Sequence, residues 1–541
     1  MAVFRINLSR ILLFGCYGVF LFIFCNLAPA AQSLIAKGPY LQAPGSNTMT
    51  IMWESPVNAP ATLFYGEGAN PNTELRIIKR TRYTSENSAL GDKITYYIYH
   101  ATLNNLKPGT TYSYYVQIGN TNTPIKKFRT FNSDKTGFIA YGDTRTNPDT
   151  HKKLAQHFKS FSPDFILHTG DLVSHGARYN VWDREFFAPL KDVMDEIPLF
   201  PVLGNHDEKS DDFFNFFVMR NKKSFYSFEA GPVFVLALDY HYEKNSDEQY
   251  RFAVKALEST KATWKIVMVH DPMFNFGGHF SHWGHKYYLP LFHRTGVDIV
   301  IAGHSHIYER FYPIAYQGAE NSSPITHITT GGGGAPLTTA SSHPSLAAYA
   351  RTNHFLFFEA TTSNIVGRCF DINGNELDFF QIVKRGGKYD SDYLAKVFPA
   401  TSLRLSLEAS TDLVARAVGI PKMNEPVLIM FKMIPLTGFS KPIKMEIELS
   451  PVSTNFYQIV GGNLTVSTPP AGSNEKIVWV KVMPKPGVIV REKDRELEPP
   501  LIFQAKIRDG NTEAIAYGRR AYISGTAQKA VGEYDEAGNG L

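Results

Sequence analysis

The sequence predicts an α+β protein of several domains, in which a β-sandwich precedes a central α/β block and a β-rich block follows it. Three observations predict this order. Period-2 hydrophobic patterns fill residues 34–132, apolar runs alternate with helix-like segments over 136–385, and period-2 patterns return over 390–526. The 541 residues are 43% hydrophobic, enough for roughly three to four domains with sizeable cores. A disordered or fibrous chain is therefore excluded.

The charge balance and the cysteine count exclude two further classes of protein. With 55 Lys and Arg against 50 Asp and Glu, the net charge is only +5, whereas a dedicated nucleic-acid binder usually carries a large basic excess. We therefore expect no nucleic-acid binding. Three cysteines are too few for a disulfide scaffold, and two of them lie in the leader described next, which leaves Cys369 alone.

Residues 1–30 have the features of a signal peptide. Arg5 and Arg10 precede an apolar run from Ile11 to Ala28, and Ala28-Pro-Ala30 offers small residues at the spacing of a signal-peptidase site. The run of 18 residues is also long enough for an uncleaved membrane anchor. We expect an exported protein, periplasmic or extracellular, which contacts the membrane only if the leader is uncleaved.

Residues 34–132 predict a small antiparallel sandwich. Thr48–Trp53 and Tyr112–Val116 alternate between polar and apolar residues, as half-buried strands do. The segment Leu106-Lys-Pro-Gly-Thr-Thr-Tyr112 resembles the turn and corner tyrosine of fibronectin type III domains. Such a module commonly packs beside a catalytic domain.

Residues 136–385 predict stacked βα units and are the candidate for an enzyme. Asp149 could cap a helix that runs through Leu154 to Phe158. Thirteen of the 17 histidines lie between His151 and His306, which points to metal or phosphate chemistry. The β-prone runs are residues 137–141, 165–167, 199–203, 233–238, 266–269 and 299–302.

Residues 390–526 contain no catalytic cluster. Ile443–Leu449 and Ile477–Val482 alternate cleanly, which predicts a β-rich accessory domain whose partner the sequence does not identify. The last segment, 527–541, is rich in Gly, Ala and acids and predicts a disordered tail.

Polar residues of one chemical kind follow five of the central β-prone runs. In an open α/β sheet, ligands collect outside the carboxyl ends of the strands, so these residues are expected to meet. Carboxylates, a carboxamide oxygen and imidazoles suit Mn, Fe or Zn. One Gly-Asp pair alone more often marks a turn, but five such ends in order make a purely structural explanation weak. The residues are Gly142-Asp143, Gly170-Asp171, Gly204-Asn205-His206-Asp207, His270 and Gly303-His304-Ser305-His306.

These five segments resemble the five motifs of the calcineurin-like metallophosphoesterases. Four further segments resemble the purple acid phosphatase branch of that family: Gly38-Pro-Tyr-Leu41, Val297-Asp298, Tyr308-Glu309-Arg310 and the Gly331–Gly334 run. The resemblance covers about residues 38–384 and implies a four-layer α/β/β/α sandwich for the central block. It does not extend to the C-terminal block.

The resemblance also implies a dinuclear metal centre with divalent or trivalent ions of Fe, Mn or Zn. Asp171 would bridge the two ions. The ligands that complete one metal site would be Asn205, His270 and His304, and those of the other would be Asp143 and His306.

Further residues are implied to contact the substrate. His206 would contact the phosphate or protonate the leaving oxygen, oriented by Asp207. His279 best matches a histidine that contacts phosphate in related enzymes, and His282 is the next candidate.

Two positions depart from the family pattern and affect one metal site. Arg145 stands where the common first motif has a histidine, and Ser174 stands where purple acid phosphatases have a tyrosine. Without a phenolate ligand, we predict no purple colour. Arg145 could bind a phosphate oxygen through a charge-assisted fork or form a structural salt bridge. His175 could approach the weaker site.

We therefore predict an exported, acid-phosphatase-like metallophosphoesterase that acts on a phosphorylated small molecule or another phosphate ester. A hydroxide held at the dinuclear site would attack phosphorus in line, with Arg145 or His279 stabilising the equatorial oxygens. A phosphodiesterase or nucleotide hydrolase is the alternative with the same site. The alternative from another class is a non-enzymatic surface binding protein with a degenerate metal site.

Overall fold

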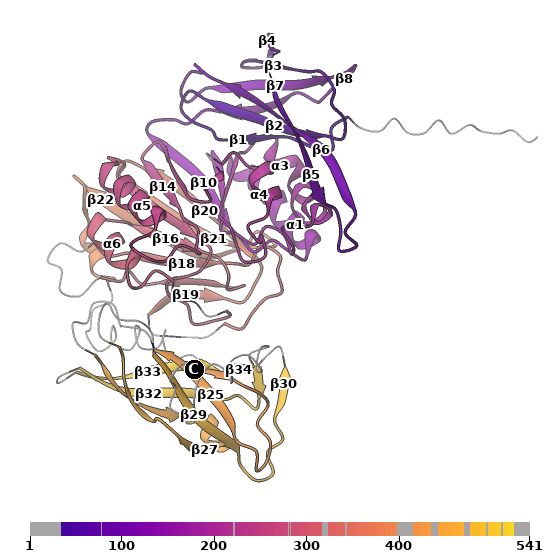
Figure 1. Ribbon diagram of the computed structural model, residues 1–541. Coiled ribbons are helices and arrows are strands. Elements are labelled where there is room, and N and C mark those ends of the chain that lie inside the picture. The colour runs from indigo at the N-terminus through magenta and orange to yellow at the C-terminus, as the bar shows by residue number, and fades with distance from the viewer. Residues whose placement is uncertain are drawn as a thin grey trace, which may run out of the picture.

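Three blocks follow one another along the chain in the computed structural model (Figure 1). The N-terminal sheets lie at the top of the view, the central block in the middle and the C-terminal sheets at the bottom. The predicted leader, His282 and the predicted tail lie outside the described residues. The described residues are 34–76, 78–219, 222–279, 281, 283–315, 323–340, 343, 345–397, 415–433, 442–469, 476–493, 496–509 and 512–523. None of their helices has the length and apolar character needed to cross a bilayer.

The N-terminal block is an antiparallel sandwich. One sheet has the order β1-β2-β6-β5, and the other has the order β4-β3-β7-β8 with β9 also paired to β7. The hydroxyl of Tyr112 accepts a hydrogen bond from the Lys107 N–H at 2.9 Å, which is the contact between a corner tyrosine and the preceding turn. The strands are β1 (Lys37–Gln42), β2 (Met49–Ser55), β3 (Ala61–Glu67), β4 (Thr73–Leu75), β5 (Lys79–Glu86), β6 (Lys93–Leu103), β7 (Thr111–Ile118), β8 (Thr121–Asn122) and β9 (Lys126–Arg129).

The central block contains two seven-stranded sheets. The first has the order β12-β11-β10-β20-β21-β22-β23 and the second β13-β14-β15-β16-β18-β17-β19. The first consists of β10 (Lys135–Tyr141), β11 (Phe165–His168), β12 (Leu199–Pro201), β20 (His354–Thr361), β21 (Asn364–Asp371), β22 (Glu376–Arg385) and β23 (Lys388–Tyr389). The second consists of β13 (Tyr226–Ala230), β14 (Val233–Ala237), β15 (Trp264–Val269), β16 (Ile299–Ala302), β17 (Tyr308–Phe311), β18 (Thr326–Thr330) and β19 (Leu346–Ala350).

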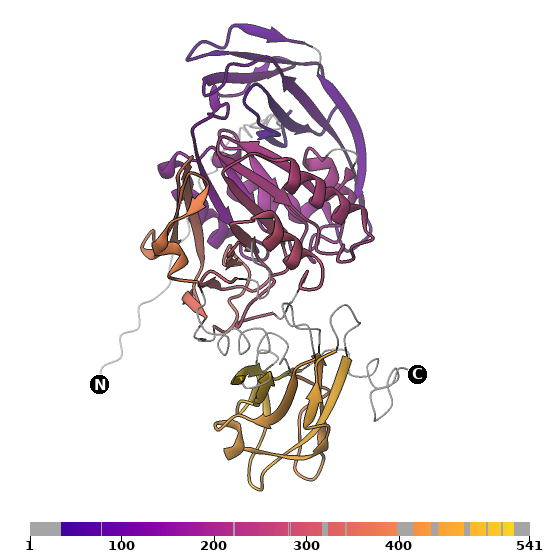
Figure 2. The ribbon, with the colours of Figure 1, turned by 90° about the vertical axis from the view of Figure 1, so that its left-hand side faces the viewer.

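The two sheets pack face to face, and helices cover their outer faces, with helices on both sides of the strands in Figure 1. Figure 2 shows the helices of one side in front of the strands. One apolar cluster, with Phe138, Leu167 and Ile266, joins the two inner faces. The four-layer α/β/β/α prediction is therefore confirmed. The first sheet is covered by α1 (Pro148–Phe158), η1 (Lys159–Phe161), α2 (Tyr179–Trp182), η2 (Asp183–Phe187), α3 (Ala188–Met194) and α4 (Asp211–Phe216), and the second by α5 (Glu248–Ser259) and α6 (Tyr288–Thr295).

Two local predictions for this block need correction. The cap of α1 is Asn147, whose side chain accepts the Thr150 N–H, while Asp149 lies in the first turn, where a carboxylate favours the helix dipole. The central block also continues past residue 385, because β23 pairs with β22 and α7 (Ser391–Leu394) follows, with Tyr393 in the core between the sheets.

The C-terminal block is a second sandwich with its own core. Its sheets have the orders β27-β29-β25-β24-β34-β31-β30 and β28-β26-β32-β33. Phe431, Phe503 and Ile447 lie in the core between them. The strands are β24 (Ala415–Ala417), β25 (Val427–Met433), β26 (Lys444–Leu449), β27 (Tyr457–Gly462), β28 (Thr465–Ser467), β29 (Lys476–Pro484), β30 (Arg491–Lys493), β31 (Glu496–Glu498), β32 (Ile502–Asp509), β33 (Thr512–Arg520) and β34 (Tyr522–Ile523), with the 3₁₀ turn η4 at Ser453–Asn455.

The N-terminal sandwich docks on the helical layer of the first sheet through buried polar contacts. Lys37 and Glu54, whose side chains are 2% and 1% exposed, form an ion pair at 2.9 Å. Tyr179 of α2 donates its hydroxyl hydrogen to Glu54, and the Lys37 ammonium lies 3.8 Å from the centre of its ring. The hydroxyl of Tyr40 donates to the Phe216 carbonyl at 2.9 Å. These contacts tie the sandwich to α2 and α4.

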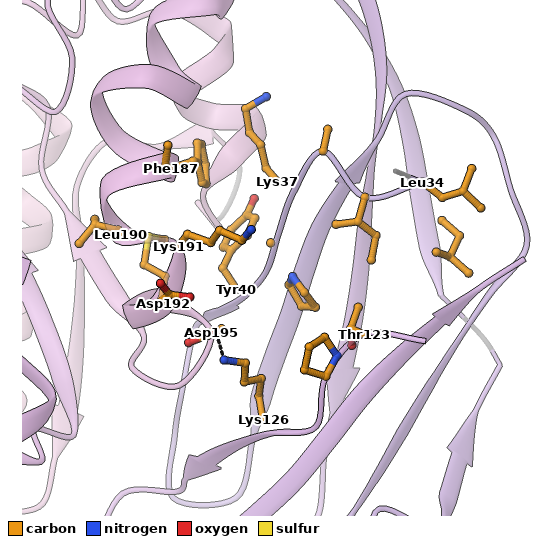
Figure 3. Close-up of a pocket in the computed structure, with 18 of the residues that line it drawn as sticks. Leu34, Lys37, Tyr40, Thr123, Lys126, Phe187, Leu190, Lys191, Asp192 and Asp195 are labelled. Carbon is orange, nitrogen blue, oxygen red and sulfur yellow. Dashed lines mark ion pairs between the residues drawn. The ribbon is translucent and has the colours of Figure 1, made fainter. Parts of the chain in front are cut away.

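A cavity of about 870 Å³ opens along the same seam (Figure 3). Lys37 and Tyr40 line it from the sandwich, and Phe187 and Leu190 line it from the helices. None of the strand-end residues predicted to bind metal lines this cavity. The cavity is therefore a feature of domain docking rather than part of the predicted site.

We expect Glu54→Ala to destabilise the seam by about 3–5 kcal/mol, because it leaves the buried Lys37 ammonium without its counter-charge. Differential scanning calorimetry should show a lower unfolding midpoint. Glu74→Ala removes an exposed partner of Arg76 instead and should leave the midpoint unchanged. Equal midpoints for both variants would show that the buried pair does not hold the seam.

A candidate dinuclear metal site at the strand ends

Five strands deliver the predicted residues to one edge of the two sheets. Asp143 follows β10, Asp171 follows β11, and residues 205–207 follow β12, all in the first sheet. His270 follows β15, and residues 304–306 follow β16, in the second sheet. These strands are parallel within each sheet, so their carboxyl ends lie on the same side.

One set of donor atoms, which we call the first group, consists of Asp171 Oδ1, Asn205 Oδ1, His270 Nε2 and His304 Nδ1. Asn205 Oδ1 lies 3.1 Å from both histidine nitrogens, which are 3.3 Å apart. His270 Nε2 lies 3.5 Å from Asp171 Oδ1. Ligand atoms about 2.1 Å from a shared ion are about 3.0–3.4 Å apart when adjacent, so this group fits a transition-metal ion.

The second group consists of Asp143, Asp171 and His306, all of them buried. His306 Nε2 lies 3.5 Å from Asp143 Oδ1. This oxygen is buried and accepts no hydrogen bond from the described residues. A buried carboxylate oxygen without a donor is costly unless a cation lies against it, so this group also suits a metal ion.

Hydrogen bonds select the ring nitrogen that each histidine presents. His270 Nδ1–H donates to the Thr169 carbonyl at 2.8 Å, and His306 Nδ1–H donates to the Pro336 carbonyl at 2.7 Å. Because a carbonyl only accepts, Nδ1 carries the hydrogen in both rings. In the neutral rings Nε2 therefore presents its lone pair to the two groups, the usual arrangement of metal-binding histidines.

The local field explains the protonation of the first group. Burial and the charge of His270 lower the pKa of His304 to about 3, which keeps that ring neutral. Burial opposes protonation of His270, but Asp171, Asp143 and Asp271 outweigh it and raise its pKa to about 9. Burial also opposes ionisation of Asp171, yet His270, His206 and Arg145 lower its pKa. The surrounding carboxylates thus favour positive charge at His270, whereas burial and that charge disfavour it at His304.

Asp207 has a different position from the one predicted. Its carboxylate accepts the backbone N–H groups of Gly204, Asp171, Leu172 and Val173, at 2.8–3.4 Å. Nδ1–H of His206 donates instead to the Ser174 carbonyl at 3.0 Å. The prediction that Asp207 orients the His206 ring is therefore wrong. The carboxylate of Asp207 instead joins the loop after β11 to the loop after β12 through these hydrogen bonds.

Arg145 contacts both metal groups. Its Nε donates to Asp171 Oδ2 at 3.1 Å, and its Nη2 lies 3.4 Å from His306 Nε2. The side chain is 14% exposed. Of the two alternatives that the sequence left open, the structure thus contains the salt bridge.

Ser174, the other departure from the family pattern, points to a buried acid that sequence reasoning missed. Glu185 of η2 accepts Ser174 N–H at 2.7 Å, the Ser174 hydroxyl at 3.0 Å and Thr146 N–H at 3.2 Å. One carboxylate therefore holds the loops after β10 and β11 together. His175 Nδ1 lies 3.4 Å from Glu208 Oε1, and His175 belongs to neither donor group.

His279 lies over the site, with its ring centre 5.3 Å from that of His304 and 5.1 Å from that of His306. Its loop is anchored by Glu309, a buried carboxylate on β17 that accepts the N–H groups of Phe276 and Gly277 at 2.8–3.1 Å. In the sequence, Glu309 was notable only as part of a segment that resembles the family, whereas the structure shows that it anchors this loop.

The tight backbone at the strand ends requires its glycines. Asp143, Asp171 and His304 themselves adopt φ of +57°, +54° and +66°, which is uncommon for non-glycine residues and typical of functional sites. A Cβ on Gly204 would lie 2.2 Å from Asp171 N, and one on Gly303 would lie 2.5 Å from Asp143 Oδ2. Larger residues at these glycines would displace the carboxylates.

Asp271 is a further acid at this edge that the sequence analysis did not single out. It forms, with His270 and His304, a set of three donor atoms within 4.8 Å of one another. The available signal was its position directly after His270 at the end of a β-prone run.

Asp207→Asn should weaken metal binding by about 10–100-fold, because an amide NH₂ would face a backbone N–H that now donates to the carboxylate. His206→Ala should leave metal affinity unchanged, since no donor atom of either group depends on that ring. Titration calorimetry with Zn²⁺ on stripped protein checks both variants. Equal losses of metal affinity in the two variants would support the original prediction that Asp207 orients His206.

Comparison with known proteins bears on this arrangement. Residues 137–308 match the family described as calcineurin-like phosphoesterase. Residues 37–130 match the family described as purple acid phosphatase, N-terminal domain. The two matches cover the sandwich and most of the central block and end before the C-terminal block.

Individual relatives agree with these matches. The chain is 28% identical over 346 residues to acid phosphatase type 7 of Mus musculus, covering 54% of this chain and 76% of that protein. It is 28% identical over 289 residues to purple acid phosphatase 21 of Arabidopsis thaliana, covering 47% and 63%. The structure of purple acid phosphatase PPD1 from yellow lupin seeds has a similar fold, with a TM-score of 0.57 at 21% identity over 68% of this chain and 77% of that one.

Proposed function

Because the chain combines a calcineurin-like phosphoesterase domain with a purple acid phosphatase N-terminal domain, we propose that it is an exported phosphatase of phosphate monoesters. Its family places it among metal-dependent hydrolases of phosphate esters. The observation that carries the proposal is the convergence of two donor groups on the shared carboxylate of Asp171. The monoester preference rests on the acid phosphatases among its relatives.

In this proposal each donor group holds one ion, and Asp171 contributes to both. Asn205, His270 and His304 complete the first site, and Asp143 and His306 complete the second. The two ions would supply Lewis-acid activation of water and neutralise phosphate charge. Fe, Mn and Zn all suit this mixture of carboxylate, carboxamide and imidazole donors.

Three side chains of the protein are proposed to act on the substrate. His206, fixed by its hydrogen bond to the Ser174 carbonyl, would present Nε2 to the phosphate or to the leaving oxygen. His279, placed over His304 and His306, would contact a phosphate oxygen. Arg145 would keep its pair with Asp171 and present the rest of its planar fork to the same anion.

The departures at Arg145 and Ser174 motivate one rival function. Ser174 donates to Glu185, so among the described residues the second group has three protein donors. A protein with this site degenerate would be a non-enzymatic binding protein. A diesterase or nucleotide hydrolase is the rival that shares the chemistry.

Asp171→Asn should lower phosphate-ester hydrolysis by at least about 10³-fold, because it removes the charge shared by both groups. The measurement is turnover of p-nitrophenyl phosphate, bis(p-nitrophenyl) phosphate and ATP by metal-reconstituted protein. The monoester is expected to be hydrolysed fastest.

Circular dichroism should confirm that the Asp171→Asn chain is folded, and Asp392→Asn, on the exposed surface of α7, serves as the matched control. Undiminished turnover in Asp171→Asn would refute the assignment of the site. If the protein hydrolyses the diester or ATP faster than the monoester, the proposed substrate class changes to phosphodiesters or nucleotides.

Elemental analysis of purified protein should find close to two metal ions per chain, and removal of the ions by a chelator should lower both turnover and the unfolding midpoint. Two ions are expected because both groups have the donor types and spacings of metal sites. One ion or none after reconstitution would favour the binding protein with a degenerate site.

Export is proposed from residues 1–30, and contact with a membrane is proposed only for an uncleaved leader. N-terminal sequencing of protein from the cell envelope or the medium would locate the cleavage site.

A further inference from the structure

Asp271 directs a carboxylate oxygen at the first group. It follows His270 directly at the end of β15, so both side chains project from the same strand end. Its Oδ1 lies 3.9 Å from His304 Nδ1, the atom that also faces Asn205 and His270. The carboxylate thus approaches the point on which the other donors converge.

The hydrogen bonds of Asp271 leave this oxygen unsatisfied. Oδ2 accepts one hydrogen bond, from the Ser281 hydroxyl at 3.2 Å. Oδ1 is buried and accepts none from the described residues. The described lysines and arginines form no ion pair with this carboxylate in the structure.

Asp143 Oδ1 in the second group has the same character. The second group therefore contains one buried carboxylate oxygen that lacks a donor, and Asp271 places another such oxygen beside the first group. Burying such an oxygen is costly unless a cation compensates it, and the nearby Asp171 charge increases the cost. The matching pattern indicates that both oxygens have the same kind of partner.

A hydrogen bond to His304 does not account for Asp271. The separation of 3.9 Å exceeds the range of a hydrogen bond. A role in holding the loop is met by Oδ2 and Ser281 alone. Neither explanation uses Oδ1.

We propose that Asp271 is an additional ligand of the ion held by Asn205, His270 and His304, which gives that ion two carboxylates, Asp171 and Asp271. The inference rests on the proposed function, because it assumes that the first group holds a metal. The ligand set implied by the family resemblance has no acid at this position. A second carboxylate makes the site more negative, so it binds hard divalent ions such as Mn²⁺ more tightly.

The test compares stripped wild-type protein with Asp271→Ala and Asp271→Asn during titration with Co²⁺. Calorimetry gives the affinity of each ion, and visible d–d absorption reports the number of ligands. We expect one of the two ions to bind about 10–100-fold more weakly in Asp271→Ala and the other to bind unchanged. The d–d absorption of Co²⁺ in Asp271→Ala should intensify, because the more weakly bound ion has one ligand fewer. Asp271→Asn retains volume and an oxygen and should show a smaller loss.

Asp239→Asn is the matched control, since Asp239 is a buried acid just beyond the neighbouring strand β14 and belongs to neither group. Its Co²⁺ affinities and spectrum should match those of the wild type. Wild-type affinities and spectrum in both Asp271 variants would overturn the inference and leave the proposed function intact. Wild-type protein that binds no Co²⁺ would overturn both.

If Asp271→Ala fails to fold, Asp271→Asn decides the question by itself. A folded Asp271→Asn chain with a changed Co²⁺ spectrum supports ligation. One with the wild-type spectrum and affinity contradicts it.

Discussion

The concentration of buried negative charge where the two central sheets meet is the constraint on which the rest of the structure depends. Asp143, Asp171 and Asp207 are almost completely buried within a few residues of strand ends. Such charge is stable only when donors or cations surround it. Backbone N–H groups surround the carboxylate of Asp207. The carboxylate of Asp171 accepts hydrogen bonds from the Arg145 side chain and from the backbone N–H of His206. The carboxylate of Asp143 leaves one oxygen for a cation. The strained backbone and the close-packed glycines follow from bringing these groups together.

Buried carboxylates that accept backbone N–H groups recur farther from the centre. Glu185 joins the loops after β10 and β11, and Glu309 anchors the loop of His279. Hydrogen bonds to an ionised carboxylate are stronger than hydrogen bonds between neutral groups, and Glu185 uses them to restrict two loops at once. The site is therefore positioned by a set of acids, of which only some face the proposed metals.

The departures from the family pattern acquire a physical meaning in this setting. Arg145 donates to the shared carboxylate of Asp171, and Ser174 donates to Glu185. The second group thus has fewer donors and a fixed positive charge beside it. Asp271 adds a carboxylate to the first group, so the distribution of negative charge differs from that implied by the family resemblance.

Much of the architecture follows from local pattern alone. Apolar runs of the right length predicted β10, β11, β14, β15 and β16, because strands buried on both faces read as continuous apolar segments. The strand-end motifs likewise identified the residues that converge on the candidate site. The sequence could not predict which groups each acid contacts, because the groups that Asp207, Glu185 and Asp271 contact lie on other segments of the chain. Only tertiary packing decides which N–H groups, imidazoles or arginines reach each carboxylate, because those contacts join residues that are close in space and distant in sequence.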